Sequence, residues 1–258
     1  MRYITALTLV DNKPIRERVP IYTSSVYPYG EILKCDTVSD GEKGYIYNIP
    51  ASFDIETTTE MECGNAFAYM YHWQMCIDTH VIFGRTWNEF IEFLQKLKTI
   101  LGIGSGYKLV IYVHNLAYEW QFMRRFFNWK KVFLLKPKQP LYAETEDGFI
   151  FRCSYKLSNM SLEKFCENSA GVRFYKLSDD AMCKHGYDPF DYSKIRTDVT
   201  PLTDNELAYM YNDVRGLCEC LSDRLREDNI KSIPLTSTGY VRRDMRRHLN
   251  ANTDYAKK

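Results

Sequence analysis

The sequence predicts an α/β fold, in which a mixed β-sheet is flanked by helices. Three observations support this: strand-length apolar segments alternate with helical ones, two helices begin at capping-box sequences, and one apolar run is typical of a central strand. The chain has 258 residues, 45% of them hydrophobic, which is enough to bury a large core. With 26% charged residues and a net charge of +1, general disorder and a purely nucleic-acid-coating role are both disfavoured.

The predicted elements follow one another in a consistent order. Three strands come first, then a helix, a buried strand, a second helix, further strands, a short helix and a long helix. Their predicted ranges are, in that order, 52–58, 66–77, 81–83, 86–101, 109–113, 119–126, 131–157, 161–167 and 203–221. This order fits an RNase H-like (DnaQ-like) fold.

Two of the helices have explicit start signals. In a capping box, a Ser or Thr and a Glu three residues later bond the first turn of a helix. Thr86 with Glu89 has this pattern, and so has Thr203 with Glu206. Gly102 is placed to end the first of these helices, since glycine readily adopts the left-handed conformation found there.

Acidic residues lie at three places that such a fold could bring together. Asp54 and Glu56 are two apart on a strand, so both carboxylates project from one face, and their repulsion favours a bound cation. Glu119 lies one helical turn beyond the apolar strand. Asp213 shares a helix face with Tyr209, four residues earlier, at the rim of the core. Alone, each place is more typical of solvated surface residues. Together they predict a site for two divalent metals, Mg²⁺ or Mn²⁺.

The same residues resemble the exonuclease motifs of B-family DNA polymerases. Residues 53–58 (FDIETT) resemble the first motif, and residues 209–213 (YMYND) resemble the third. Residues 114–119 (HNLAYE) resemble the second motif in the form used by protein-primed phage and plasmid polymerases. That motif usually ends in Asp, where this chain has Glu119.

The resemblance implies a metal-dependent 3′→5′ exonuclease. Asp54, Glu56, Glu119 and Asp213 would bind two metals, and Tyr209 would position the attacking water. The residues implied to hold the single-stranded 3′ end are Thr57, Asn115, Tyr118, Ser154 and Tyr155.

The resemblance also implies a catalytic lysine, which precedes an Asp-Tyr segment in the family. Asp191 and Tyr192 match that segment, although the stretch before them is longer here. Lys184 is the first candidate for this lysine, and Lys176 is the second. Independently of the family, an aromatic ring at Tyr118 would suit the stacking of bases.

Three parts of the chain are predicted: an N-terminal segment (1–50), an RNase H-like exonuclease domain (51–230) and a basic tail (231–258) that would join a polymerase domain absent from this sequence. The expected partners are a single-stranded DNA 3′ end and a terminal priming protein. A monomer without a membrane span is expected, in the cytoplasm (of the host, if phage-encoded). Two alternatives stay open: a free-standing DNA or RNA exonuclease, and an inactive module that binds single strands or a priming protein.

Overall fold

The computed structural model describes residues 1–10, 13–176, 183 and 189–251. The strands are β1 (Arg2–Val10), β2 (Lys13–Tyr22), β3 (Thr37–Ser39), β4 (Tyr45–Tyr47), β5 (Ala51–Glu62), β6 (Asn65–Ile77), β7 (His80–Gly84), β8 (Tyr107–Val113), β9 (Trp129–Lys136), β10 (Gln139–Thr145) and β11 (Phe149–Cys153). The helices are α1 (Tyr29–Ile32), α2 (Trp87–Leu101), α3 (Leu116–Met123), α4 (Ser154–Ser158), α5 (Leu162–Glu167), α7 (Asp204–Leu225) and α8 (Ser237–Ala251).

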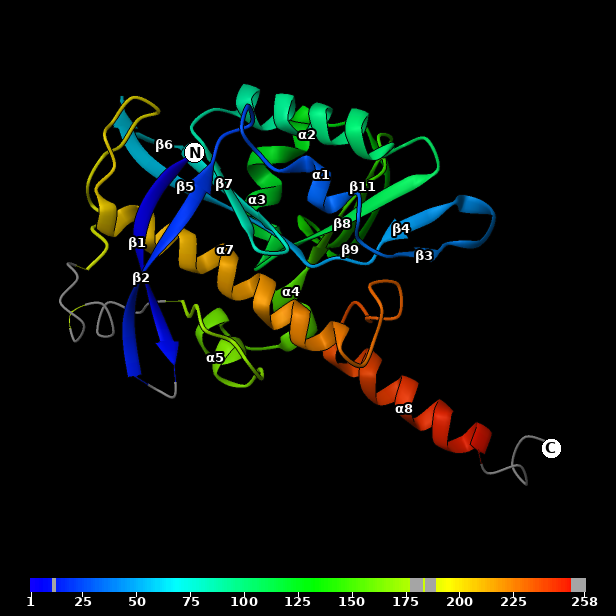
Figure 1. Ribbon diagram of the computed structural model, residues 1–258. Helices are drawn as coiled ribbons and strands as arrows, with labels where there is room; N and C mark the ends of the chain where they lie inside the picture. Colours follow the sequence, from blue (N-terminus) through cyan, green and yellow to red (C-terminus); the bar gives the residue numbers. More distant parts are fainter. Residues whose placement is uncertain (11–12, 177–182, 184–188, 252–258) are drawn as a thin grey trace.

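The described residues form one mixed sheet of 11 strands, around which the helices are arranged (Figure 1). Nine strands lie in the order β1-β2-β7-β6-β5-β8-β11-β10-β9, and the β3–β4 pair joins the sheet at β8. The β5–β6 and β6–β7 pairs are antiparallel, whereas β8 runs parallel to both β5 and β11. This mixed sheet, flanked by helices, confirms the predicted RNase H-like α/β fold.

Helices cover both faces of the sheet. On one face, α2 and α3 pack in a cluster that includes Phe53 and Ile55 of β5. On the other face, α5 and α7 pack in a cluster that includes Val110 of β8. Because side chains alternate along a strand, Asp54 and Glu56 of β5 project away from α2 and toward α7.

The two main helices begin where the capping boxes predict. The Thr86 side chain accepts a hydrogen bond from the Glu89 amide, and the Glu89 carboxylate accepts one from the Thr86 amide. Thr203 and Glu206 make the same reciprocal pair at the start of α7. Gly102 ends α2 with φ of 65°, in the left-handed region that glycine tolerates.

Residues 1–50 contribute strands to the same sheet. β1 and β2 form an antiparallel hairpin, and β2 pairs in parallel with β7, where Ile21 lies opposite Val81. Helix α7 covers this hairpin and buries Ile4 in a cluster with its own Leu207. The domain boundaries stay a prediction, but the N-terminal hairpin shares a core with the long helix.

One segment forms a different element from the one that the sequence predicts. Strand β11 ends at Cys153, and the next residues form helix α4 instead of continuing the strand. A helical turn there directs Leu157 into the core cluster under α7, and Asn159 ends the helix with φ of 58°. In the basic tail, α8 is a helix that extends away from the sheet (Figure 1). None of the helices described here is long and apolar enough to cross a membrane.

Candidate metal centre

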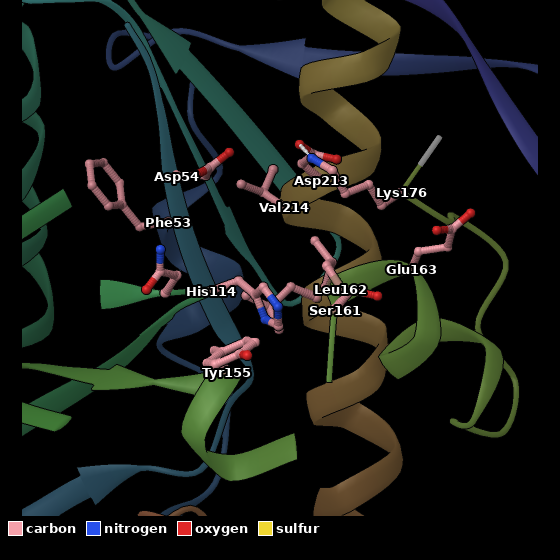
Figure 2. Close-up of a pocket in the computed structure, with 12 residues that line it drawn as sticks. Phe53, Asp54, His114, Tyr155, Ser161, Leu162, Glu163, Lys176, Asp213 and Val214 are labelled. Carbon is pink, nitrogen blue, oxygen red and sulfur yellow. Dashed lines mark hydrogen bonds and ion pairs between the residues drawn. The ribbon is translucent and has the colours of Figure 1, made fainter. Parts of the chain in front are cut away.

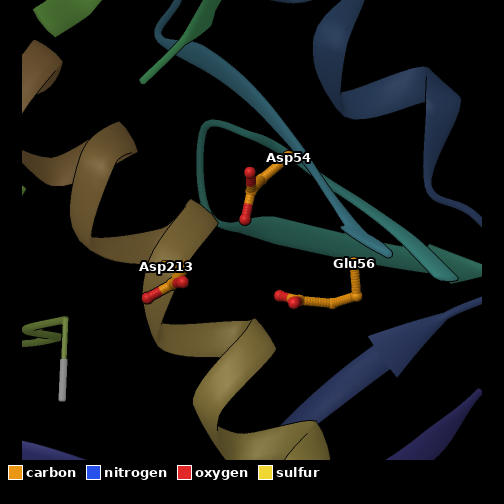
Figure 3. Close-up of side chains that lie close together, drawn as sticks. All are labelled: Asp54, Glu56 and Asp213. Carbon is orange, nitrogen blue, oxygen red and sulfur yellow. The ribbon is translucent and has the colours of Figure 1, made fainter. Parts of the chain in front are cut away.

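Three carboxylates meet between the sheet and α7. Asp54 and Glu56 project from β5 toward Asp213 on α7 (Figure 3). One oxygen from each side chain lies within 4.8 Å of the others. Asp213 is 3% exposed, whereas Asp54 and Glu56 are half-buried. The fold thus brings together the predicted acids of the first strand and of the last long helix.

Gln74 on β6 holds the two strand carboxylates. It lies opposite Asp54 in the β5–β6 pairing. Its Nε2 donates to Asp54 Oδ2 at 3.0 Å and to Glu56 Oε1 at 3.2 Å. Sequence reasoning missed this residue, although a polar side chain inside the otherwise apolar end of β6 was a usable signal.

Glu119 lies beside Asp54 and is also buried, at 3% exposure. The turn before α3 brings it there, because Asn115 adopts a left-handed conformation (φ 75°) between β8 and the helix. Its carboxyl hydrogen bonds with that of Asp54. Glu119 Oε2 has no hydrogen-bond partner among the described residues. Glu119 therefore adjoins the centre through Asp54.

Burial and mutual repulsion disfavour negative charge in this group. Burial and then the charge of Asp213 raise the pKa of Asp54 to about 6. Burial and then Asp54 raise the pKa of Glu56 and of Glu119 well above the usual range for a glutamate. Burial also raises the pKa of Asp213, although Lys176 opposes this. A divalent cation would relieve these costs, because it favours the ionised form of every carboxylate around it.

Lys176 contacts the centre with its ammonium group. Its Nζ donates to Asp213 Oδ2 at 2.5 Å and to Tyr209 Oη at 2.8 Å. Burial opposes the charge on Lys176, but Asp213 and Asp54 outweigh it and raise the pKa of the ammonium. The second lysine candidate therefore lies at the carboxylates, and Lys184 lies outside the described residues.

Tyr209 is buried, at 3% exposure, and not at the rim of the core as expected. The segment after residue 188 covers it: the ring of Phe190 lies 4.6 Å from that of Tyr209. The Tyr192 and Tyr209 hydroxyl oxygens are 2.7 Å apart. Burial and then Asp213 raise the pKa of Tyr209, so its phenol keeps its proton. Tyr209 is thus buried by a loop segment that contains Phe190 and Tyr192. The helical pattern of residues around Tyr209 gives no indication of this segment.

Three of the residues expected to hold the DNA strand lie together near β5. Tyr118 is 41% exposed, and its hydroxyl hydrogen bonds with that of Thr57. Its ring is 5.3 Å from that of Phe122, so the two form an aromatic surface on α3. Asn115 is exposed at the turn before α3.

The remaining two expected contacts differ from each other. Ser154 is fully buried; its Oγ donates to the Val113 carbonyl at 3.3 Å and lies 3.0 Å from His114 Nδ1. Tyr155 is 36% exposed, and its ring is 5.7 Å from that of His114. Ser154 is therefore not accessible itself and contacts His114, whereas Tyr155 is accessible. Burial and then Lys176 lower the pKa of His114 to about 4, so its ring is neutral at pH 7.

A cavity of about 580 Å³ opens from the carboxylates (Figure 2). Asp54, Asp213 and Lys176 form one end of it. His114 and Tyr155 line another part, and side chains from α5 and α7 complete the wall. The centre is therefore reachable from solvent through a mixed polar and aromatic cavity.

No protein-family model matches the chain, and no curated protein does either. Among solved structures, it is similar to Phi29 DNA polymerase, in a ternary complex with primer-template DNA and incoming nucleotide substrates. The TM-score is 0.50 and the sequence identity 17%, over 70% of this chain and 31% of that one. The chain thus spans about a third of the length of the polymerase chain. At this level of identity the likeness concerns the fold alone: the RNase H-like sheet and helices described above have a counterpart within Phi29 DNA polymerase.

Proposed function

We propose that this chain is a metal-dependent 3′→5′ exonuclease that hydrolyses terminal phosphodiesters of single-stranded DNA. The observation that carries this proposal is the meeting of Asp54, Glu56 and Asp213 within 4.8 Å, beside Lys176 and Tyr209. We further propose that it is the proofreading domain of a protein-primed DNA polymerase. The similarity to Phi29 DNA polymerase, whose structure holds primer-template DNA, supports this second step.

The residues present fit divalent cations. Carboxylate oxygens are the ligands that Mg²⁺ and Mn²⁺ prefer, and three of them converge here. Asp213 Oδ1 is buried and has no hydrogen-bond partner among the described residues, and the same holds for Glu119 Oε2. Burying an acceptor without a donor costs folding free energy, and a bound cation would offset that cost for these two oxygens.

Each side chain then has a task in the reaction. Divalent cations held there would act as Lewis acids, which activate water and stabilise charge on phosphate oxygens. Asp54, Glu56 and Asp213 would hold the cations, with Glu119 completing the set through Asp54. Lys176 would supply fixed positive charge for the phosphate. It also fixes the Tyr209 hydroxyl, which would orient the attacking water.

The proposed substrate is the 3′ end of a single strand, which would enter through the cavity. The exposed ring of Tyr118 offers a stacking surface, worth about 1–3 kcal/mol per base. Thr57 and Asn115 offer hydrogen bonds beside it, and Tyr155 offers a second ring in the cavity. A terminal priming protein is proposed as the partner of the longer polymerase.

The decisive experiment uses a 3′-labelled single-stranded DNA oligonucleotide with Mg²⁺ or Mn²⁺. The wild type should release labelled mononucleotide, and the Asp54→Ala, Glu56→Ala double variant should release none above background. The matched control is Glu60→Ala with Glu62→Ala, which removes two acids with the same spacing from the far end of β5.

Three results would contradict the proposal. The wild type could release no mononucleotide, the Asp54, Glu56 variant could be as active as the wild type, or the control pair could lose as much activity. Running the same oligonucleotide as RNA separates a DNA proofreading activity from a free-standing RNA exonuclease, since the 2′-OH is the difference between the two substrates.

A further inference from the structure

Arg196 is a buried cation outside the metal centre, at 2% exposure. Its Nε and Nη2 bind Glu206 Oε1 at 2.8 and 2.7 Å. Its Nη1 donates to the carbonyl oxygens of Asp191 at 2.7 Å and of Lys194 at 2.9 Å. A planar guanidinium is suited to such divergent contacts, because its donors point in fixed directions. One side chain thus ties the segment from Asp191 to Arg196 to the first turn of α7.

Glu206, which binds the Arg196 guanidinium, is itself held in place. Glu206 uses its other oxygen, Oε2, to accept from the Thr203 backbone amide at 2.7 Å and from the Thr203 hydroxyl at 3.0 Å. The same carboxylate therefore caps α7 and holds Arg196. Along the helix, Glu206 lies about one turn before Tyr209. The Arg196 backbone amide also donates to Thr58 Oγ1 at 3.4 Å, which links the segment to β5.

The segment that Arg196 holds carries the side chains that surround Tyr209. The Arg196 guanidinium lies over the ring of Phe190 at 4.8 Å. Phe190 in turn packs against the Tyr209 ring at 4.6 Å, and the Tyr192 and Tyr209 hydroxyls hydrogen bond at 2.7 Å. On its other side, the Tyr209 hydroxyl accepts from Lys176.

We infer that Arg196 is a positioning residue, which holds the segment 190–196 so that Phe190 and Tyr192 fix the Tyr209 phenol beside Lys176. This inference rests on the proposed exonuclease function, in which Tyr209 orients the attacking water. Among the described residues, Arg196 has no contact with the carboxylates of the metal centre. Its loss should therefore slow the hydrolysis of bound substrate and leave substrate binding through Tyr118 in place.

Arg85 provides a matched control. It is also a guanidinium that ties a loop to the body, and it donates to the carbonyl oxygens of Thr197 at 2.7 Å and Thr200 at 2.8 Å. Thr197 and Thr200 lie just after the segment held by Arg196, and neither side chain has a described contact with Tyr209. Arg85→Met therefore removes the same kind of guanidinium–carbonyl contact from residues next to the 190–196 segment. It leaves the contacts of Phe190 and Tyr192 in place.

The test compares Arg196→Met, Arg196→Lys and Arg85→Met by steady-state exonuclease kinetics and by hydrogen–deuterium exchange. Arg196→Met should lower kcat roughly ten- to hundredfold, as loss of an outer supporting contact commonly does, with KM within about twofold of the wild type. Amides of 190–196 should exchange faster. Arg196→Lys, which keeps the pair with Glu206, should recover part of kcat. Arg85→Met should keep the wild-type kcat.

The inference is overturned if Arg196→Met keeps the wild-type kcat, or loses it without faster exchange in 190–196. It is also overturned if Arg85→Met lowers kcat equally, because a general loss of stability would then explain both. A wild type without nuclease activity would sink the proposed function and the catalytic part of this inference. The exchange measurement would still decide whether Arg196 holds the segment.

Discussion

The Gln74 amide donates to the carboxylates of both Asp54 and Glu56, which repel each other when both are ionised. Gln74→Met keeps the volume of this side chain and removes its donors. Asp54 and Glu56 should then spread, so we expect the affinity for Mn²⁺ to fall about ten- to hundredfold. Calorimetric titration of the variant with Mn²⁺ measures this directly. An unchanged dissociation constant would mean that Gln74 does not hold the carboxylates in place.

The two candidates for the catalytic lysine, Lys176 and Lys184, can be distinguished by substituting each of them. Lys176 contacts both Asp213 and Tyr209, so Lys176→Met should lower the exonuclease kcat by about 10²–10³, the size expected for losing a preorganised charge at a phosphate. Lys184→Met should lower kcat far less. Rates measured with saturating oligonucleotide distinguish the two. Equal losses, or a larger loss for Lys184→Met, would reject Lys176 as the catalytic lysine.

Much of the candidate site could be predicted from side-chain chemistry and motif order. Asp54, Glu56 and Asp213 do converge, because a strand and a helix each impose a fixed periodicity on their side chains. Gln74 could not be placed, since the register of β6 against β5 is set by tertiary pairing. The burial of Tyr209 could not be predicted either, because an irregular segment covers it.

At the scale of elements, the cap of α7 matters for the site as well as for the helix. Thr203→Ala removes a side-chain acceptor from the Glu206 amide and should cost about 1 kcal/mol of unfolding free energy. The matched control is Thr99→Ala in α2, where the hydroxyl only donates back to the Gln95 carbonyl and alanine is the better helix former. Urea unfolding at pH 7 measures both. Equal losses in the two variants would show that the cap itself contributes little.

Helices and strands could be predicted where a sequence pattern of a few residues marks them. Those without such a pattern could not. The two capped helices, the hairpin of β6 and β7 and the central strand β8 follow from patterns within a few residues. Helix α4 is too short for a helical period to show, and a strand was expected in its place. The parallel pairing of β2 with β7 joins distant segments, so no local pattern contains it.

At the scale of the whole molecule, the metal centre links the sheet to the helix that covers it. A cation bound by both should stabilise the fold by about 2.7 kcal/mol at a hundred times its dissociation constant. Asp54→Asn should remove this gain and should raise the stability of the metal-free protein, because it removes one repelling charge. Thermal unfolding with Mn²⁺ and with EDTA measures both effects. The same Mn²⁺ shift in Asp54→Asn would place the cation elsewhere.

His72 makes the stability of the molecule depend on pH. It is 1% exposed, and burial followed by Arg85 lowers its pKa to about 3 from 6.5. Between these values the unfolded chain binds a proton that the folded one does not, so stability is lost as the pH falls below 6.5. Going from pH 7 to pH 5 should cost about 2 kcal/mol for this group.

Replacing the imidazole tests that dependence. His72→Leu should flatten the fall in unfolding free energy between pH 7 and pH 5, whereas His248→Ala, at an exposed position on α8, should leave it as in the wild type. The carboxylates of the metal centre act in the opposite direction, but they are present in all three proteins and cancel in the comparison. Parallel curves for His72→Leu and the wild type would exclude His72 as the cause.

The hairpin of β1 and β2 leaves the ribosome before the two elements that pack against it. Its neighbour β7 is complete only at residue 84, and α7, which covers Ile4, only at residue 225. Until α7 has been translated, the apolar face of the hairpin therefore stays uncovered, the condition in which nascent chains aggregate or engage chaperones. The yield of folded protein in a cell should thus depend on how the growing chain is shielded until α7 has emerged.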